Sequence, residues 1–182
     1  MKRRIFSFGS ICTAALVFGC ATSAALAQKR YDPGASDKEI LVGGVAPYSG
    51  PASAFGNLGK AAAAYFEKVN AEGGVNGRKI RFISLDDSYN PAKTVEQVRK
   101  LVEQEEVLLT FNIIGTAHNT AVQKYLNDKK VPQLFAGSPA TKFGDPKNFP
   151  WTMGWGLPYQ VEGRSFAQYV LENKPNGKIA VL

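Results

Sequence analysis

Short apolar runs alternate with amphipathic stretches along the chain from residue 39 onward. The runs of strand length are residues 40–46, 79–85, 107–114 and 131–136. The stretches with helical apolar spacing are residues 55–70, one that begins at Pro91 and one that begins at Thr116. Strands that alternate with helices of ordinary length predict an α/β fold, a doubly wound parallel sheet.

Local signals mark the start of two of these helices. Asn90 can accept hydrogen bonds from the first helical N–H groups, and Pro91 suits the first position, where no N–H is needed. Thr116 is predicted to cap the third helix in the same way.

The second half of the chain is less regular. Residues 107–114 are almost wholly apolar, which is typical of a central strand covered on both faces. Residues 142–158 are irregular and rich in glycine, proline and aromatic side chains, whereas residues 159–173 predict a helix and residues 178–182 a further strand. Since a buried strand needs neighbours on both sides, this order favours the front part of a longer protein.

The chain opens with the pattern of a secretory signal peptide, residues 1–27. A basic start at residues 2–4 precedes an apolar stretch, 5–19, and small residues lead to a cleavage site after Ala27. A membrane anchor is an alternative, but the apolar centre falls short of the roughly 20 residues that span a bilayer. A lipoprotein lipidated at Cys20 is a further alternative, which a bulky residue close before that cysteine disfavours.

Charge and cysteine content narrow the class of protein. The net charge is +7, and three of the positive charges lie in residues 2–4, which leaves +4 scattered among acidic residues. Nucleic acid is therefore not expected as a partner. Both cysteines, Cys12 and Cys20, lie in the predicted signal, and His118 is the single histidine, so neither a disulfide, a metal site nor a cofactor is expected.

Catalytic and nucleotide-binding motifs do not fit the sequence. Gly59-Lys60 lacks the spacing and the following hydroxyl of a P-loop. Ser138 lacks the flanking glycines of a nucleophile elbow, and His118 is expected to face solvent in the first turn of a helix. The pair Asp86-Asp87 is interpreted as loop and capping residues. The chain is therefore not expected to be an enzyme.

Three loops must open on the same edge of a parallel sheet. They are residues 47–55, 115–118 and 137–140, and all are rich in small or polar residues. A helix that starts near Thr116 offers N–H groups and a partial positive charge, which suit a carboxylate. These loops are either ordinary turns or a ligand site.

Three sequence stretches resemble the leucine/isoleucine/valine-binding type of periplasmic substrate-binding protein, which serves ABC importers. They are GGVAPYSGP at 43–51 followed by Phe55-Gly56, NAEGGVNGR at 70–78 and DDSYNP at 86–91. The resemblance runs in order from about residue 39 to 182. It implies two α/β lobes that close on a small ligand, a periplasmic location, and membrane subunits of an ABC transporter as partners.

The resemblance also implies a set of ligand-binding residues. Thr116 and Ala117 would hold the ligand carboxylate through a hydroxyl and a backbone N–H. Pro139 departs from the hydroxyl residue of amino-acid binders, so either a branched-chain amino acid or an aromatic carboxylate or amide remains a candidate ligand. The implied ligand-binding residues are Phe55, Thr116, Ala117, Gly137, Ser138 and Pro139. The aromatic residues that could line an aromatic pocket are Tyr48, Phe55, Trp151 and Trp155, the two tryptophans being candidates also for core or hinge packing.

The chain is expected to divide into four segments. They are the signal peptide (1–27), a flexible polar leader (28–39), an incomplete N-terminal lobe (40–151), and a hinge crossing with the start of a truncated second lobe (152–182). Two rival functions stay open. One is the ligand-sensing domain of a receptor, and the other is a truncated product without binding of its own, because half a cleft buries one side of a ligand.

Overall fold

The computed structural model describes residues 30–180, which are built on a five-stranded sheet. The predicted signal peptide, residues 1–27, lies outside the described residues. The strands are β1 (Glu39–Ala46), β2 (Lys79–Asp86), β3 (Leu109–Phe111), β4 (Gln133–Ala136) and β5 (Thr152–Gly154). The helices are α1 (Gly56–Ala71), α2 (Pro91–Glu103), α3 (Thr116–Asp128) and α4 (Tyr159–Asn173), with short 3-10 helices at Ser53–Phe55 and Thr141–Gly144.

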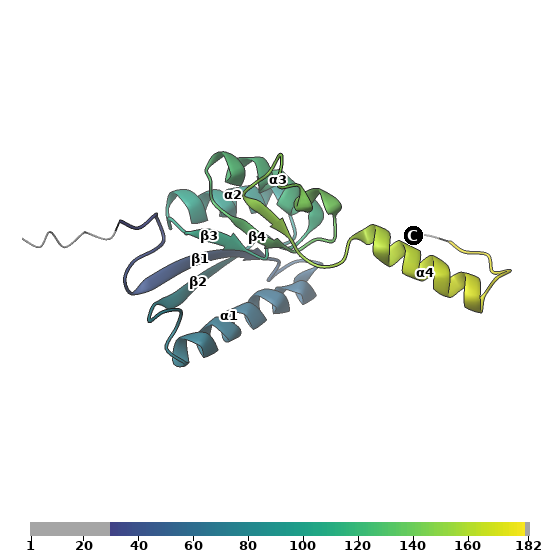
Figure 1. Cartoon of the computed structure of the whole chain (residues 1–182), viewed down its shortest axis with the longest axis horizontal. Coiled ribbons are helices and arrows are strands. Elements are labelled where there is room, and N and C mark those ends of the chain that lie inside the picture. Colours follow the sequence, from purple (N-terminus) through teal and green to yellow (C-terminus); the bar gives the residue numbers. More distant parts are fainter. Residues whose placement is uncertain (1–29, 181–182) are drawn as a thin grey trace, which may run out of the picture. The chain divides into compact units, whose positions relative to one another are not determined.

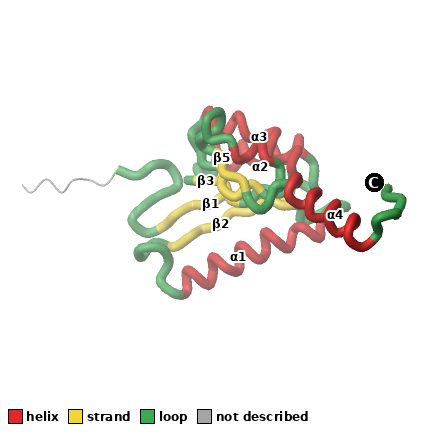
Figure 2. The backbone as a smooth tube through the Cα atoms, turned by 45° about the vertical axis from the view of Figure 1, so that its right-hand side comes forward, coloured by secondary structure: helices red, strands yellow, loops and turns green. Residues whose placement is uncertain are grey.

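All neighbouring strands pair in parallel, in the order β2-β1-β3-β4-β5. Helix α1 lies on one face of the sheet, and α2 and α3 lie on the other (Figures 1 and 2). The predicted α/β class and parallel sheet are therefore confirmed, and so are the predicted helices at α1, α2, α3 and α4.

The core lies between the sheet and the helices α2 and α3. Burial of each large aliphatic side chain removes apolar surface from water and contributes about 1.5–3 kcal/mol. The core cluster consists of Val45, Val98, Leu101, Val107, Ile113, Val122 and Leu126.

Helix α2 begins as predicted. Asn90 has an extended backbone, and its side-chain oxygen accepts hydrogen bonds from the N–H groups of Ala92 at 2.9 Å and Lys93 at 3.4 Å. Pro91 occupies the first helical position. This cap fixes the start of the helix, so that Val98 and Leu101 turn toward the sheet.

Strand β3 is shorter than the predicted strand at 107–114. Asn112 has a φ of +51°, which takes the backbone out of the extended conformation. Its side-chain amide donates a hydrogen bond of 3.0 Å to the carbonyl of Phe135 on β4. Beyond this break, Ile114 forms an isolated parallel bridge with Gly137.

Strand β5 lies in the stretch that the sequence indicates as irregular and as the start of the crossing. Buried polar side chains join it to β4 and α3. Thr152 Oγ1 donates to Gln133 Oε1 at 3.0 Å and accepts from Asn127 Nδ2 at 2.8 Å. Gln133 Nε2 in turn donates to Asn119 Oδ1 at 2.9 Å. Residues 152–154 therefore belong to the five-stranded sheet as strand β5.

Both ends of the described chain differ from expectation. The residues before β1 are expected to be flexible, but Leu41 N–H donates to the Gly34 carbonyl at 2.7 Å and Ala35 bridges to Ile40. The predicted strand at 178–182 is wrong for residues 178–180, which are exposed and do not belong to the five-stranded sheet. Residues 181–182 lie outside the described residues.

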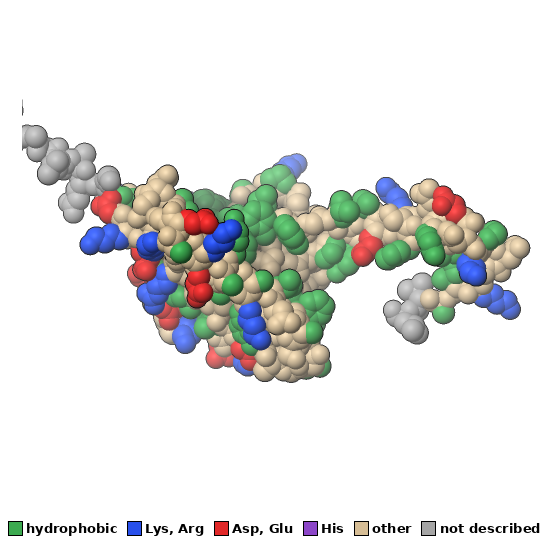
Figure 3. Space-filling view, turned by 90° about the horizontal axis from the view of Figure 1, so that it is seen from below, with side chains coloured by type: hydrophobic (Ala, Val, Ile, Leu, Met, Phe, Trp, Pro, Cys, Tyr) green, Lys and Arg blue, Asp and Glu red, His purple; other side chains and the backbone are tan. Residues whose placement is uncertain are grey.

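Two helices leave apolar side chains on the surface. The apolar spacing of residues 55–70 predicts one buried stripe that includes Leu58 and either Tyr65 or Phe66. On α1, Phe66 packs its ring 5.2 Å from that of Phe82, whereas Leu58 and Tyr65 are exposed. Helix α4 carries apolar side chains along its exposed surface, including Phe166 and Leu171 (Figure 3).

We expect Leu101→Ala to lower the free energy of unfolding by about 2–5 kcal/mol, because Leu101 is fully buried and its loss leaves a cavity. Urea denaturation followed by circular dichroism measures this change. Leu171→Ala on α4 is the matched control, since Leu171 is 68 % exposed and its truncation should change stability little. Equal losses in the two variants would contradict the assigned core.

Candidate ligand-binding site

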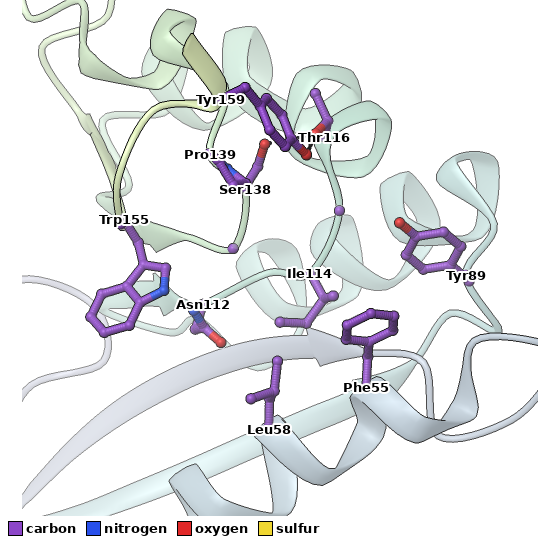
Figure 4. Close-up of a pocket in the computed structure, with 13 residues that line it drawn as sticks. Phe55, Leu58, Tyr89, Asn112, Ile114, Thr116, Ser138, Pro139, Trp155 and Tyr159 are labelled. Carbon is purple, nitrogen blue, oxygen red and sulfur yellow. Dashed lines mark hydrogen bonds between the residues drawn. The ribbon is translucent and has the colours of Figure 1, made fainter. Parts of the chain in front are cut away.

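A cavity of about 350 Å³ lies where the strands of the sheet end at their carboxyl edge (Figure 4). Its aromatic and aliphatic lining residues are Phe55, Leu58, Tyr89, Ile114, Trp155 and Tyr159. Its polar and small lining residues are Asn112, Gly115, Thr116, Gly137, Ser138, Pro139 and Gly156. Among the described residues, none that lines this cavity carries a formal charge, so its polarity comes from hydroxyl, amide and backbone groups.

The structure brings five of the six sequence-predicted residues together around this cavity. The exception is Ala117, which is exposed in the first turn of α3 and does not line the cavity. The geometry shows that the five residues converge. Their contact with a ligand stays a prediction.

Helix α3 begins at this cavity without a capping side chain. Gly115, with a φ of +107°, is the N-cap residue, and Thr116 is the first helical residue, which corrects the predicted cap. The Thr116 hydroxyl bonds instead to the Ser138 hydroxyl at 2.7 Å. The N–H groups of the first turn have no acceptor within the helix, and the helix dipole gives them a partial positive charge.

His118 is buried, and the expectation that it faces solvent is wrong. It is 3 % exposed, and its ring lies 4.3 Å from that of Tyr89, at an angle of 36°. Spacing of four residues places His118 on the same helical face as Val122 and Leu126, which are core residues. Neither ring nitrogen has a hydrogen-bond partner among the described residues. The His118 ring therefore packs against the ring of Tyr89, which lines the cavity.

Asp86, at the end of β2, accepts hydrogen bonds from two loops. Its Oδ1 accepts from the N–H groups of Tyr48 at 2.8 Å, Ser49 at 3.1 Å and Ser88 at 3.0 Å, and its Oδ2 accepts from the Ser49 hydroxyl at 2.5 Å. Lys93 Nζ lies 3.7 Å from Oδ2. The Ser49 hydroxyl above all, helped by these backbone donors, holds the pKa of the Asp86 carboxyl well below its usual range.

This carboxylate ties together the loops that carry Phe55 and Tyr89 to the cavity. The prediction that Asp86 and Asp87 are loop and capping residues holds in part: Asp86 is the last residue of β2, and Asn90 is the cap of α2. Asp87 lies in the loop, where it accepts from the Tyr89 N–H at 2.9 Å and from the Thr94 hydroxyl at 2.6 Å. Neither carboxylate lines the cavity.

A family profile described as "Periplasmic binding protein" matches residues 39–182 of the chain. The chain belongs to this family. It is 27 % identical over 148 residues to the Leu/Ile/Val-binding protein homolog 3 of Brucella melitensis biotype 1, a match that covers 79 % of this chain and 39 % of that protein. It is 27 % identical over 101 residues to an amino acid binding protein of Pseudomonas aeruginosa, covering 55 % of this chain and 27 % of that one.

Solved structures agree with the fold. A fatty acid ABC transporter substrate-binding protein from Thermomonospora curvata superimposes with a TM-score of 0.71 and 24 % identity, over 82 % of this chain and 37 % of that one. This periplasmic binding protein chain thus spans well under half the length of the relatives that it matches.

Several lining residues of this periplasmic binding protein were not indicated by the sequence as site residues. Tyr89, Asn112 and Tyr159 reach the cavity from three separate loops or helix ends, and no spacing within the chain links them. For Asn112 the sequence does hold a signal that could have indicated the site, because it is a polar residue near the end of an apolar run. Of the predicted aromatic lining, Phe55 and Trp155 face the cavity.

The other two predicted aromatic residues lie elsewhere. The Tyr48 hydroxyl bonds to Ser84 at 2.5 Å, beneath α1. Trp151 borders a separate cavity at the amino edge of the strands, next to Lys129 and Lys130.

The described part of the chain holds no group of three or more His, Cys, Asp or Glu side chains with the geometry of a metal site. Over residues 30–180, no helix has the length and apolar character that crossing a membrane requires.

We expect Gly115→Ala to destabilise the protein, because a Cβ there would lie 2.2 Å from His118 Nδ1. Gly73→Ala is the matched control. Gly73 has a nearly equal φ of +109° but nothing within 4 Å of its Cβ position, so it shares the backbone strain without the clash. The free energy of unfolding should fall by about 1–3 kcal/mol more in the Gly115 variant. Similar losses measured by urea denaturation would argue against the tight contact with His118.

We expect Asp86→Asn to lower the free energy of unfolding at neutral pH by about 1–3 kcal/mol, because an amide cannot replace a carboxylate that accepts on both oxygens. Since folding depresses the Asp86 pKa below its ordinary value of 3.8, its contribution is present above that value and is lost as pH falls toward the lower folded pKa. Urea denaturation from neutral pH down to about pH 3 should therefore give a shallower acid loss for the variant.

Asp128→Asn is the control for this experiment. Asp128 makes only an exposed pair with Lys124, at 2.7 Å, and such pairs contribute little. An acid profile for Asp86→Asn that is identical to that of Asp128→Asn would contradict the role of Asp86.

Proposed function

We propose that the chain is part of the solute-binding component of an ABC importer, acts in the periplasm after removal of the predicted signal peptide, and works with the membrane subunits of that importer. Its ligand would be a small organic acid, such as a branched-chain amino acid, captured between two lobes. The observation that carries the proposal is the cavity at the uncapped start of α3, with the bonded hydroxyls of Thr116 and Ser138 beside it.

The chemistry of this cavity favours a carboxylate. N–H groups at a helix start attract anions because they lack acceptors and carry the positive end of the helix dipole. The Thr116 and Ser138 hydroxyls can reorient to donate to an anion. The carboxylates of Asp86 and Asp87, at and just after the end of β2, are already engaged by donors and lie outside the lining. An anionic ligand therefore meets donors and no unpaired negative charge.

The remainder of the lining supports an apolar body on the ligand. Phe55, Tyr89, Trp155 and Tyr159 surround the cavity with aromatic rings, and these rings favour an aromatic carboxylate as the second candidate ligand. The names of the relatives, which refer to leucine, isoleucine and valine, to amino acids and to fatty acids, support the same general class. A solute-binding role requires no covalent chemistry, so the chain is proposed not to be an enzyme.

We expect the purified chain to bind L-leucine, benzoate or octanoate with a dissociation constant of about 1 mM or weaker, because this lobe contacts one side of the ligand. Two-dimensional NMR titration of the backbone amides measures such weak binding. Shifts should concentrate at residues 115–117 and 137–139. Absence of shifts with all three acids, or shifts confined to other parts of the chain, would contradict the proposal.

Thr116→Val tests the hydroxyl directly. It should raise the dissociation constant of the carboxylate that binds by about 3- to 10-fold, the net contribution of one typical hydrogen bond. Thr120→Val on the same helix is the control, since the Thr120 hydroxyl donates to the Thr116 carbonyl at 2.7 Å and does not line the cavity.

A further inference from the structure

Tyr159 is the first residue of α4 and faces the cavity. Its backbone N–H donates to the Pro139 carbonyl at 3.1 Å, and its phenol oxygen lies 3.5 Å from Thr116 Oγ1. The side chain is 50 % exposed and points toward Thr116 and Ser138 in Figure 4. It follows a connecting segment in which Gly156 has a φ of +81°.

Within the described chain, the hydrogen bonds that α4 makes to the sheet and its loops both come from Tyr159. Other bonds of this helix stay within it or return to its N-cap residue, as the N–H groups of Val161 and Glu162 do to Pro158. The apolar side chains farther along α4 are exposed. A group that binds Tyr159 therefore contacts the residue through which α4 is hydrogen-bonded to the loops of the cavity.

The phenol proton is only weakly engaged. Hydroxyl pairs bond best at about 2.7–2.8 Å, a distance that Thr116 and Ser138 achieve and that the Tyr159 pair at 3.5 Å does not. A carboxylate oxygen is a stronger acceptor than a hydroxyl, and its bonds are shorter. A carboxylate at the start of α3 would thus draw the phenol away from Thr116.

We propose that Tyr159 is a ligand-contacting residue. Its phenol donates to the ligand carboxylate held at Thr116 and Ser138, and this bond couples occupancy of the cavity to the position of α4. The inference rests on the proposed function, since it requires that the cavity binds a carboxylate. It adds a residue beyond the implied set, and it assigns α4 a direct part in sensing the ligand.

The test is the variant Tyr159→Phe, with Tyr169→Phe as its matched control on the same helix. Tyr169 is 65 % exposed and does not line the cavity. NMR titrations would compare benzoate with benzamide, octanoate with octanamide, and L-leucine with L-leucinamide. For every acid that the unmodified chain binds, Tyr159→Phe should raise the dissociation constant about tenfold, and the amide of that acid should lose about threefold or less. Tyr169→Phe should change neither value.

A second readout separates contact from structural support. Addition of the acid should shift the amide resonances of residues 160–165 in the unmodified chain and leave them unmoved in Tyr159→Phe. The melting temperatures of the two proteins without ligand should be equal. Equal acid binding by Tyr159→Phe and the unmodified chain would overturn this inference alone. Absence of binding by the unmodified chain to all three acids would overturn the proposed function together with the inference.

Discussion

The common direction of the five strands is the constraint on which the rest of the structure depends. Because every strand runs parallel, each loop that follows a strand emerges at the same edge, and every helix N-terminus faces that edge. The chain order reverses between β1 and β3, and such a reversal opens a crevice outside the strand ends. The cavity lies there, lined from the loops after β1, β2, β3, β4 and β5.

Much of this architecture could be predicted from the spacing of apolar residues. The changes between strand and helix periods located α1, α2, α3 and α4, and the parallel sheet then required the loops at 47–55, 115–118 and 137–140 to converge. Asn90 and Pro91 predicted the start of α2 because their chemistry acts on the nearest residues. These are local effects, and a local pattern records them.

The errors arose where side chains reach across the fold. Strand β5 is held to β4 by Thr152 and Gln133 through buried hydrogen bonds, so it has no apolar alternation. Strand β3 ends before Asn112 because this residue has a left-handed backbone conformation. The residues next to it in the sequence do not predict that conformation. The polarity of His118 favours a solvent-facing position, but its spacing of four residues from Val122 places it on the buried face of α3.

The site shows the same division. Resemblance and loop geometry indicated Thr116 and Ser138, which now lie within bonding distance of each other. Tyr89 lies more than forty residues before Ser138, and Tyr159 lies more than forty residues after Thr116. The fold of the sheet brings both tyrosines to the same cavity. Pro139 lacks an N–H, yet its carbonyl has a use, since it receives the first N–H of α4.

The hydrogen bonds of Asp86 make the two loops at the rim of the cavity depend on each other. The loop with Ser49 and the loop with Ser88 are fastened to one carboxylate, so they form a single mechanical part although 39 residues separate the two serines. If one loop were exchanged for that of a homologue, the Asp86 carboxylate would lose the hydrogen-bond donors that this loop supplies. We therefore expect replacement of both loops together to preserve the structure of this rim better than replacement of one loop alone.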